Sequence, residues 1–313
     1  MNDIKKIGLT ALAGSLVAGS VSAAELTATG SASLTYSGGD EKETTGQGWT
    51  MGDSITMSAS GDVNDIGVTL SFEIDNDDVG GGNVYDTHSI TFDLGDAGTL
   101  AFFGHGGSSA VGAKDDVMPT AYQEPWDVVT GAETTLIGGG GGDNMFSYTY
   151  SHDSGLTANI TYVNAADAVT DVSNTEYGIE YTGVDGLTIG YAQGDVEKTT
   201  NTKSTNDTMY AKYAIGGITA GIQFSEKDND SGVDYESTGM GISYQVNDDL
   251  AVSYGAHTIE TSTTTPDQDS SAVSFSYTMG SLSISGSLHN VDSVNHSTTN
   301  DREHYELSVG FNF

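Results

Sequence analysis

The residues with the greatest capacity for chemistry lie in one long, glycine-studded insert, residues 104–143. Its charged side chains are Lys114, Asp115, Asp116, Glu124, Asp127, Glu133 and Asp143. Carboxylates gathered in one segment attract cations by Coulomb forces. The chain has no cysteine, and neither a G-x-S-x-G nor an H-E-x-x-H motif accompanies these acids. The chemistry that they predict is therefore electrostatic selection and not covalent catalysis.

Motifs for metal or phosphate binding are incomplete. Residues 138–143 fit one calcium-binding nonapeptide, but a β-roll needs several tandem copies. Residues 75–86 lack an EF-hand ligand and both helices, and residues 104–109 lack the lysine of a phosphate-binding loop. We predict no cofactor, with one alternative left open. Ca²⁺ or Mg²⁺ would then bind loosely to outer-loop acids, either Asp75, Asp77 and Asp78 or Asp228, Asp230 and Asp234.

Composition indicates an exported protein with an unusual charge. Residues 1–23 have the features of a signal peptide, with Lys5 and Lys6, an apolar stretch and a small-residue ending at Ala23. The formal net charge of the 313 residues is −35, and Arg302 is the sole arginine. Such a surface repels nucleic acid and collects cations. Residues 24–313 are predicted to form one domain.

Sixteen segments of this domain alternate apolar and polar residues with a period of two, which is the pattern of a β-strand with one apolar face. In residues 25–36, Leu26, Leu34 and Tyr36 share one face, and Thr27 and Thr35 lie on the other. The predicted strands are 25–36, 49–61, 66–74, 84–94, 99–104, 146–150, 156–162, 177–181, 187–191, 209–215, 218–224, 240–244, 250–256, 273–279, 282–288 and 305–313.

The connections alternate in length. Tight turns are predicted at 62–65, 95–98, 153–155, 183–186, 216–217, 246–249 and 280–281. Longer, acidic loops are predicted at 40–48, 76–83, 104–143, 164–174, 195–206, 226–234, 260–269 and 292–301. Short turns at one end and long loops at the other are typical of an outer-membrane barrel. The sequence therefore predicts an all-β, transmembrane, antiparallel barrel of 16 strands.

Aromatic residues of the apolar face fall into two bands, as expected at the two edges of a membrane. The band near the long loops contains Tyr36, Trp49, Tyr162, Tyr177, Tyr191 and Phe224. The band near the tight turns contains Tyr150, Tyr181, Tyr213, Tyr244, Tyr277 and Phe313. A β-sandwich with ordinary core aromatics is the alternative, but it has no need of both bands.

The opposite face is polar and carries Glu73, Asp93, Glu176, Glu180 and Lys212, with Gln223, His257 and His289. Burying such groups without partners costs about 1–3 kcal/mol each. The interior is therefore predicted to be wet, and 16 strands enclose an aqueous channel.

At this point the chain resembles a Gram-negative general porin of the 16-stranded, trimeric kind. The resemblance is carried by the signal peptide, by the hairpin DNMFSYTYSHDSGLTANITYV at 143–163, and by the closing strand YELSVGFNF. The last strand, which ends at Phe313, resembles the signal read by the barrel-insertion machinery. The resemblance implies a multi-pass barrel in the outer membrane of a Gram-negative bacterium, surrounded by lipid and lipopolysaccharide.

The resemblance also implies that the third outer loop, 104–143, folds into the lumen and narrows it. Lys114, Asp115, Asp116, Glu124, Asp127 and Glu133 would then form the constriction. Family members usually have several arginines on the wall opposite this acidic loop. In this chain, Lys212 is the only lysine that we place on a strand with its side chain facing the lumen. We therefore expect a negative pore that passes cations and small hydrophilic nutrients by diffusion. Residues 76–83 are a candidate latch between subunits of a homotrimer.

Two other functions stay open at this point. The first is an outer-membrane barrel enzyme, such as a lipase, because a Ser/His/acid site assembled across strands leaves no sequence motif. The second is a plugged barrel with a structural or adhesive role. Hydrolase assays would detect the first, and absence of single-channel current would favour the second.

Overall fold

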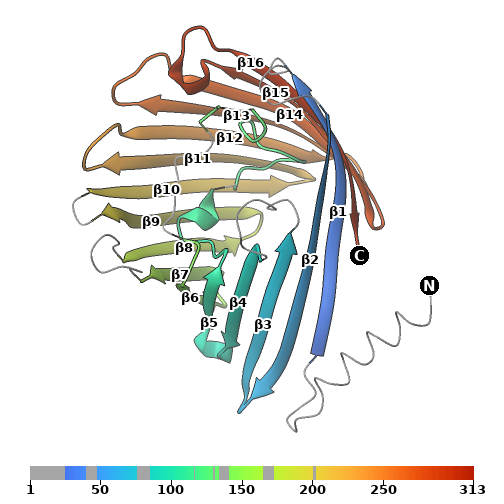
Figure 1. The fold of residues 1–313 in the computed structure, drawn as a ribbon, viewed down its shortest axis with the longest axis vertical. Coiled ribbons are helices and arrows are strands. Elements are labelled where there is room, and N and C mark those ends of the chain that lie inside the picture. The colour runs from blue at the N-terminus through green and yellow to red at the C-terminus, as the bar shows by residue number, and fades with distance from the viewer. Residues whose placement is uncertain are drawn as a thin grey trace.

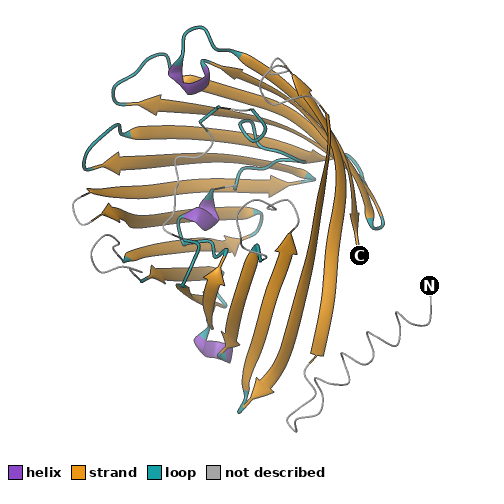
Figure 2. Cartoon of the chain, viewed as in Figure 1, coloured by secondary structure: helices purple, strands orange, loops and turns teal. Residues whose placement is uncertain are grey.

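The structure is a computed structural model that describes residues 25–39, 48–75, 85–115, 117–129, 131–133, 141–164, 173–199 and 202–313. Strands form nearly all of the regular structure (Figure 2). They are β1 (Glu25–Gly39), β2 (Gly48–Val63), β3 (Ile66–Asp75), β4 (Thr87–Asp93), β5 (Thr99–His105), β6 (Met145–His152), β7 (Leu156–Val163), β8 (Asn174–Val184), β9 (Leu187–Thr199), β10 (Thr202–Ile215), β11 (Ile218–Asn229), β12 (Tyr235–Gln245), β13 (Leu250–Thr261), β14 (Gln268–Met279), β15 (Leu282–Asp292) and β16 (Arg302–Asn312). Short 3₁₀ turns occur at η1 (Gly95–Ala97), η2 (Gly112–Lys114) and η3 (Val294–His296).

The strands close into an antiparallel barrel in which each pairs with its sequence neighbours (Figure 1). β16 pairs with β1, so the described part of the chain has no free sheet edge. The last residue continues this pairing, because the backbones of Phe313 and Gly30 exchange two hydrogen bonds of 2.9 Å. The predicted barrel of 16 strands is confirmed.

The tight turns predicted from sequence are confirmed. β2 and β3 are joined by Asn64 and Asp65, which both have positive φ, of 51° and 67°. Two residues with positive φ form the type I′ turn, whose twist matches that of the flanking strands. Asparagine and aspartate adopt this conformation at low cost, and the turn fixes the register in which Val63 faces Ile66.

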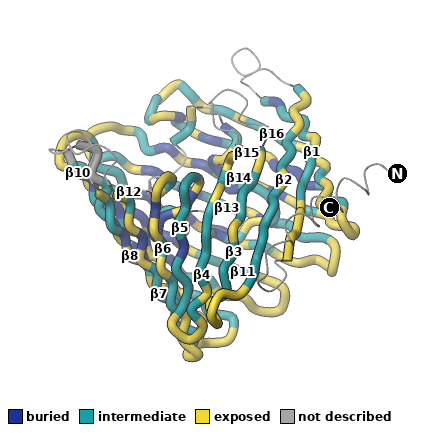
Figure 3. Tube along the Cα trace, turned by 60° about the horizontal axis from the view of Figure 1, so that its bottom comes forward, coloured by how far each residue is buried: buried dark blue, intermediate teal, exposed yellow. Residues whose placement is uncertain are grey.

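The two faces of the barrel differ in polarity. Figure 3 shows where buried and exposed residues occur along the strands. Large exposed apolar side chains, such as Leu34, Met51 and Ile222, project outward. Serine, threonine and glutamine occupy alternate positions, and many of them are buried on the inner face. Small apolar clusters occur only where the chain between β5 and β6 meets the wall or the η3 turn, as described below. Within the described residues, the barrel therefore lacks a packed apolar core.

The predicted aromatic bands lie on the outward face. Trp49, Tyr177 and Phe313 are among the most exposed side chains of this face. Tyr36 is partly covered because its ring packs against Trp49 at 5.1 Å and against Tyr305 at 6.3 Å. None of the helices within the described ranges has the length and hydropathy that a membrane-crossing helix requires.

One predicted loop is largely strand. β9 extends to Thr199 and β10 begins at Thr202, so most of the loop expected at 195–206 continues the sheet. β11 likewise extends to Asn229, into the loop expected at 226–234. These segments are polar on both faces because they lie beyond the apolar band, and the period-two signal is lost there.

The extended strands carry a row of carboxylates at the outer rim of the apolar face. In register, Asp207 faces Glu226, Glu226 faces Glu236, and Glu236 faces Glu260. Like charges directly opposite each other are unfavourable, so this row is expected only where water is close. It marks the edge of the apolar band on β10–β13.

Several predictions fall wholly or mostly outside the described residues. These include the signal peptide at 1–23, the latch at 76–83 and the loops at 40–48 and 164–174. The fourth predicted strand, 84–94, corresponds to β4, which begins at Thr87.

Candidate functional site

The candidate site is built by the chain between β5 and β6. We call its described residues, 106–115, 117–129, 131–133 and 141–144, the inner segment. It lies across the interior of the barrel in Figure 1. Its first anchor is on β7 and β8, where Ala110 N donates to Thr161 Oγ1 (3.0 Å) and Val111 N to Glu176 Oε2 (2.8 Å). Val111 also packs against Ala192 of β9.

The second anchor is at η2, where two basic side chains lie beside an aromatic ring. Lys114 Nζ lies 3.3 Å from Glu180 Oε2 on β8, and the hydroxyl of Tyr210 on β10 donates to the same oxygen. Gln223 Nε2 on β11 donates to the backbone carbonyl of Lys114 at 2.6 Å. The ammonium groups of Lys114 and Lys212 lie 5.9 and 5.5 Å from the centre of the Tyr210 ring.

The third anchor is a seat formed by glycines of the wall. A Cβ added to Gly241 of β12 would lie 2.7 Å from the carbonyl oxygen of Pro119. A Cβ at Gly221 of β11 would lie 2.8 Å from Pro119 Cδ, and one at Gly255 of β13 would lie 2.9 Å from Pro125 Cγ. These three glycines are aligned in register across the three strands. The inner segment can approach the wall here because it meets no side chains.

The fourth anchor uses wall hydroxyls. Ala121 N donates to Ser253 Oγ (2.9 Å) and Tyr122 N to Ser274 Oγ (3.2 Å). The hydroxyl of Tyr122 lies 3.4 Å from Glu306 Oε2 on β16. Burial raises the pKa of Tyr122 above its usual value of 10.0, and the negative charge of Glu306 contributes to the rise.

The last anchor is aromatic. The rings of Trp126 and His257 lie 4.1 Å apart, and His289 Nδ1 donates to the carbonyl of Pro125 at 3.1 Å. Beyond it, Glu133 N donates to Gln268 Oε1 at 2.9 Å. The anchors therefore run from β7 round to β16. This placement agrees with the predicted inward fold of the third outer loop.

The structure separates the carboxylates predicted for the constriction. Glu124 is buried, and its backbone N–H donates to Asp127 Oδ2 at 2.6 Å, so Asp127 stabilises a turn. Glu133 meets the wall through its backbone. Asp115 follows η2 and is half-buried, whereas Asp116 lies outside the described residues.

The predicted wall residues also differ from one another. Glu176 is 1% exposed, and Glu180 is engaged by Tyr210 and Lys114. Asp93 accepts a hydrogen bond from Gly95 N (3.0 Å) at a tight turn, far along the strand from the long loops. Glu73 is half-buried on the inner face of β3.

Sequence reasoning missed several inner-face residues. The expectation that Lys212 is the only lumen-facing lysine on a strand is wrong, because strand register also places Lys227 of β11 on the inner face. Arg302 lies there too, at the start of β16. Tyr210 and Glu306 were also missed, although counting alternate positions from Tyr213 and Tyr305 would have found them.

Of the two sets of outer-loop acids proposed for divalent ions, Asp228, Asp230 and Asp234 lie within the described residues and do not form a group that could hold a metal ion. Asp230 Oδ2 accepts from Lys203 N (3.2 Å) and Asp234 Oδ1 accepts from Asn229 N (2.9 Å). Among the residues described, no group of three acids or histidines is arranged to hold a metal ion. Asp77 and Asp78 lie outside those residues, and loose ion binding stays a prediction.

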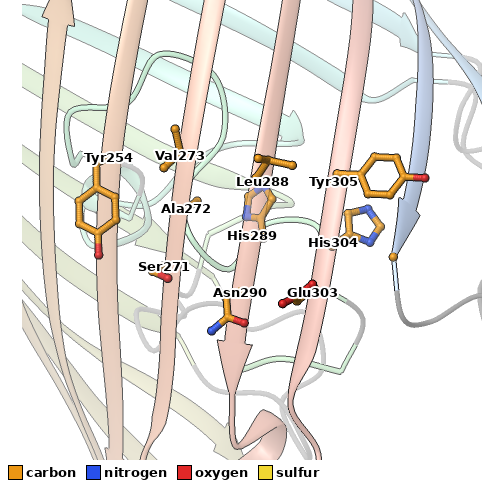
Figure 4. A pocket seen from close by; sticks show the side chains of 11 residues that line it. Tyr254, Ser271, Ala272, Val273, Leu288, His289, Asn290, Glu303, His304 and Tyr305 are labelled. Carbon is orange, nitrogen blue, oxygen red and sulfur yellow. The ribbon is translucent and has the colours of Figure 1, made fainter.

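A pocket of about 510 Å³ lies on the β13–β16 wall (Figure 4). Outward-facing Tyr254, Leu288 and Tyr305 contribute to its lining, together with His289 and His304. Because apolar side chains of the outward face line it, this pocket is a feature of the wall and not the water passage.

Known proteins share this architecture. A family model described as Gram-negative porin matches residues 8–313. An anion-selective porin from Comamonas acidovorans has a similar structure, with a TM-score of 0.71 at 14% identity, covering 93% of this chain and 100% of that chain. A comparison with curated proteins gives no match.

An outer-membrane protein of Vibrio cholerae, OmpT, is also similar. Its loop L8 deletion mutant gives a TM-score of 0.70 at 16% identity, covering 93% of this chain and 99% of that chain. Its trimer form gives 0.66 at 14% identity, with coverage of 93% and 99%. Family and fold indicate a channel and not an enzyme. The chain therefore belongs to the Gram-negative porin family and forms an outer-membrane β-barrel channel.

Proposed function

We propose that this porin is a water-filled, cation-selective diffusion channel for ions and small hydrophilic nutrients. The observation that supports cation selectivity is the charge of the inner face. By strand register, its described acids are Glu25, Asp62, Glu73, Asp75, Asp93, Glu176, Glu180 and Glu306, and its described bases are Lys212, Lys227 and Arg302.

This excess of acids acts on ions inside the barrel. Low-dielectric walls concentrate the field in a water-filled passage, and the Debye length of about 10 Å at 0.1 M salt leaves such a passage within reach of its wall charges. Cations are therefore attracted and multivalent anions are disfavoured. The anion-selective porin has the same fold at 14% identity, so the sign of selectivity depends on the side chains.

The route for solutes is supported by the position of the inner segment, whose anchors run from β7 to β16. On β1 and β2, inner hydroxyls bond to one another, as in Ser31 to Ser54 (3.1 Å) and Thr27 to Ser58 (2.6 Å). We propose that water and ions pass between the inner segment and this hydroxyl-lined wall.

Reversal potentials in a salt gradient across planar bilayers test the selectivity. The wild type is expected to prefer potassium, and a Glu73→Gln/Glu306→Gln variant should prefer it less. The matched control is Glu226→Gln/Glu236→Gln, which removes the same charge from the outward face. A wild type that prefers chloride would refute cation selectivity, and absence of single-channel current would favour a plugged barrel.

We also propose a homotrimer that contacts lipopolysaccharide and is inserted through its C-terminal strand. The trimer form of OmpT supports the oligomeric state. Sedimentation of the detergent-solubilised protein should give three copies per particle, and a monomeric species that conducts would refute the trimer while leaving the channel intact.

A further inference from the structure

The inner face contains a cluster in which two ammonium groups share one carboxylate. Lys114, Glu180, Tyr210 and Lys212 form a cluster on β8, β10 and η2, with two positive charges and one negative charge. Lys114 pairs with Glu180 at 3.3 Å. Lys212 makes no ion pair within 4.0 Å with any residue that the structure describes. This cluster is locally cationic in a chain of net charge −35.

The geometry explains why Glu180 does not pair with Lys212. The Tyr210 ring lies over Gly190 of β9, where any side chain would block it, and so reaches Glu180 on β8. Its hydroxyl and Lys114 both donate to Glu180 Oε2. Lys212 lies over the same ring, 5.5 Å from its centre, which favours a cation without using its N–H donors.

Small wall residues and the inner segment border this ammonium group. The inner-face neighbours of Lys212 in register are Thr188 on β9 and Gly221 on β11. The inner segment covers Gly221 with Pro119, so Thr188 marks the side on which the wall next to Lys212 is small and polar. Lys212 as a whole is half-buried on the inner face. A solute carboxylate can accept N–H groups of Lys212 for which the described residues provide no ion-pair acceptor.

We propose that Lys212, positioned by Tyr210, is a docking point for carboxylate groups of small solutes inside the channel. Solutes with a carboxylate, including zwitterions, would pause here while cations continue along the acidic wall. The cluster lies beside the inner segment and partly on it, so it differs from the arginines that family members place opposite this loop. The inference requires a conducting channel but does not depend on its cation selectivity.

The test uses the full mature protein in planar bilayers, with potassium chloride as the conducting salt and succinate as the added probe. We expect succinate to reduce the wild-type current in a saturable manner. In Lys212→Gln, the half-blocking concentration should rise about three- to tenfold, as expected for loss of one partly exposed charged contact. Lys212→Arg should retain the block.

Two further variants separate docking from a general change of charge. Lys203→Gln is the matched control, because Lys203 is also on β10 but faces outward, where it pairs with Asp195 at 2.6 Å. Succinate should block the current of this variant as it blocks that of the wild type. Tyr210→Phe keeps the ring and frees Glu180 to compete for Lys212, so its block should weaken while its conductance in chloride persists.

Failure of the docking point and failure of the proposed channel would give different results. Absence of current in the wild type refutes the open channel itself. Current that succinate does not affect, or an equal loss of block in Lys203→Gln and Lys212→Gln, overturns the docking point alone. Sulfate, added at the same concentration and with the same chloride concentration, is the charge control. If sulfate blocks the current as strongly as succinate does, the docking point is also overturned, because the site would then recognise charge and not the carboxylate.

Discussion

The sharpest prediction concerns the glycine seat beneath the inner segment. In Gly241→Ala, the new methyl group would lie 2.7 Å from the Pro119 carbonyl oxygen and 3.1 Å from Pro119 Cδ and N. Two of these three atoms belong to the backbone, so rotation of a side chain cannot relieve the overlap. Gly241 is paired on both sides, with Gly221 and Gly255, so the wall is the less yielding partner. The inner segment is therefore expected to move.

The magnitude can be compared with what holds the segment in place. Overpacking by one methyl group costs about 1–3 kcal/mol, which equals the net contribution of roughly one to three hydrogen bonds. Near Pro119 the segment is held by the bonds to Ser253, to Ser274 and from Gln223. The substitution should thus favour displaced arrangements by about 5- to 150-fold. Gly241→Leu, with a larger overlap, should displace the segment more completely.

Single-channel conductance is the assay, because a displaced segment widens the passage. We expect larger and noisier current steps in Gly241→Ala, and larger steps again in Gly241→Leu. The matched control is Gly67→Ala on the inner face of β3, where the nearest atoms belong to the side chains of Asp93 (3.2 Å) and Asp62 (3.9 Å). Wild-type conductance in a folded Gly241→Leu barrel, or an equal increase in Gly67→Ala, would refute the reasoning.

Two more predictions concern the same segment. Ser253→Ala/Ser274→Ala should remove the wall acceptors of two backbone N–H groups of the segment, those of Ala121 and Tyr122, at up to about 1–3 kcal/mol each where water cannot reach them. Faster cleavage between Pro119 and Pro125 by an added protease would be the readout, and unchanged cleavage would contradict the anchor. Because the pKa of Tyr122 is raised in the fold, its stabilising contribution is present below pH 10 and is lost as the pH rises through the folded-state value. Alkaline titration should therefore loosen the segment in the wild type but not in Tyr122→Phe, and identical titrations would count against this contribution.

The barrel could be predicted because its physical signal is local and repeated. Each strand crosses an apolar layer, so alternation between Leu34 and Thr35, for example, appears without knowledge of any partner strand. The signal ends where the apolar layer ends. For that reason the sequence placed Lys203 and Lys227 in loops, although both belong to strands that continue into water.

The site was harder to predict because its contacts join residues that are distant in sequence. Charged residues of the inner segment and of the wall were identified, but nothing in the order of residues indicates that Glu176 accepts a hydrogen bond from Val111 N. The glycines at 221, 241 and 255 are individually unremarkable in a chain with 42 glycines. Their role depends on cross-strand register, which only the closed barrel defines.

These placements change how the net charge relates to selectivity. Asp127 and Glu176 hold backbone N–H groups of the inner segment, and Glu180 is shared by Tyr210 and Lys114. Their first role is to fix the constriction, whereas Glu226 and Glu236 lie on the outward rim. We therefore expect Glu73 and Glu306 on one side, and Lys212 on the other, to contribute most directly to the proposed selectivity. If so, exchanging those few side chains should change the sign of the proposed selectivity while the barrel stays the same.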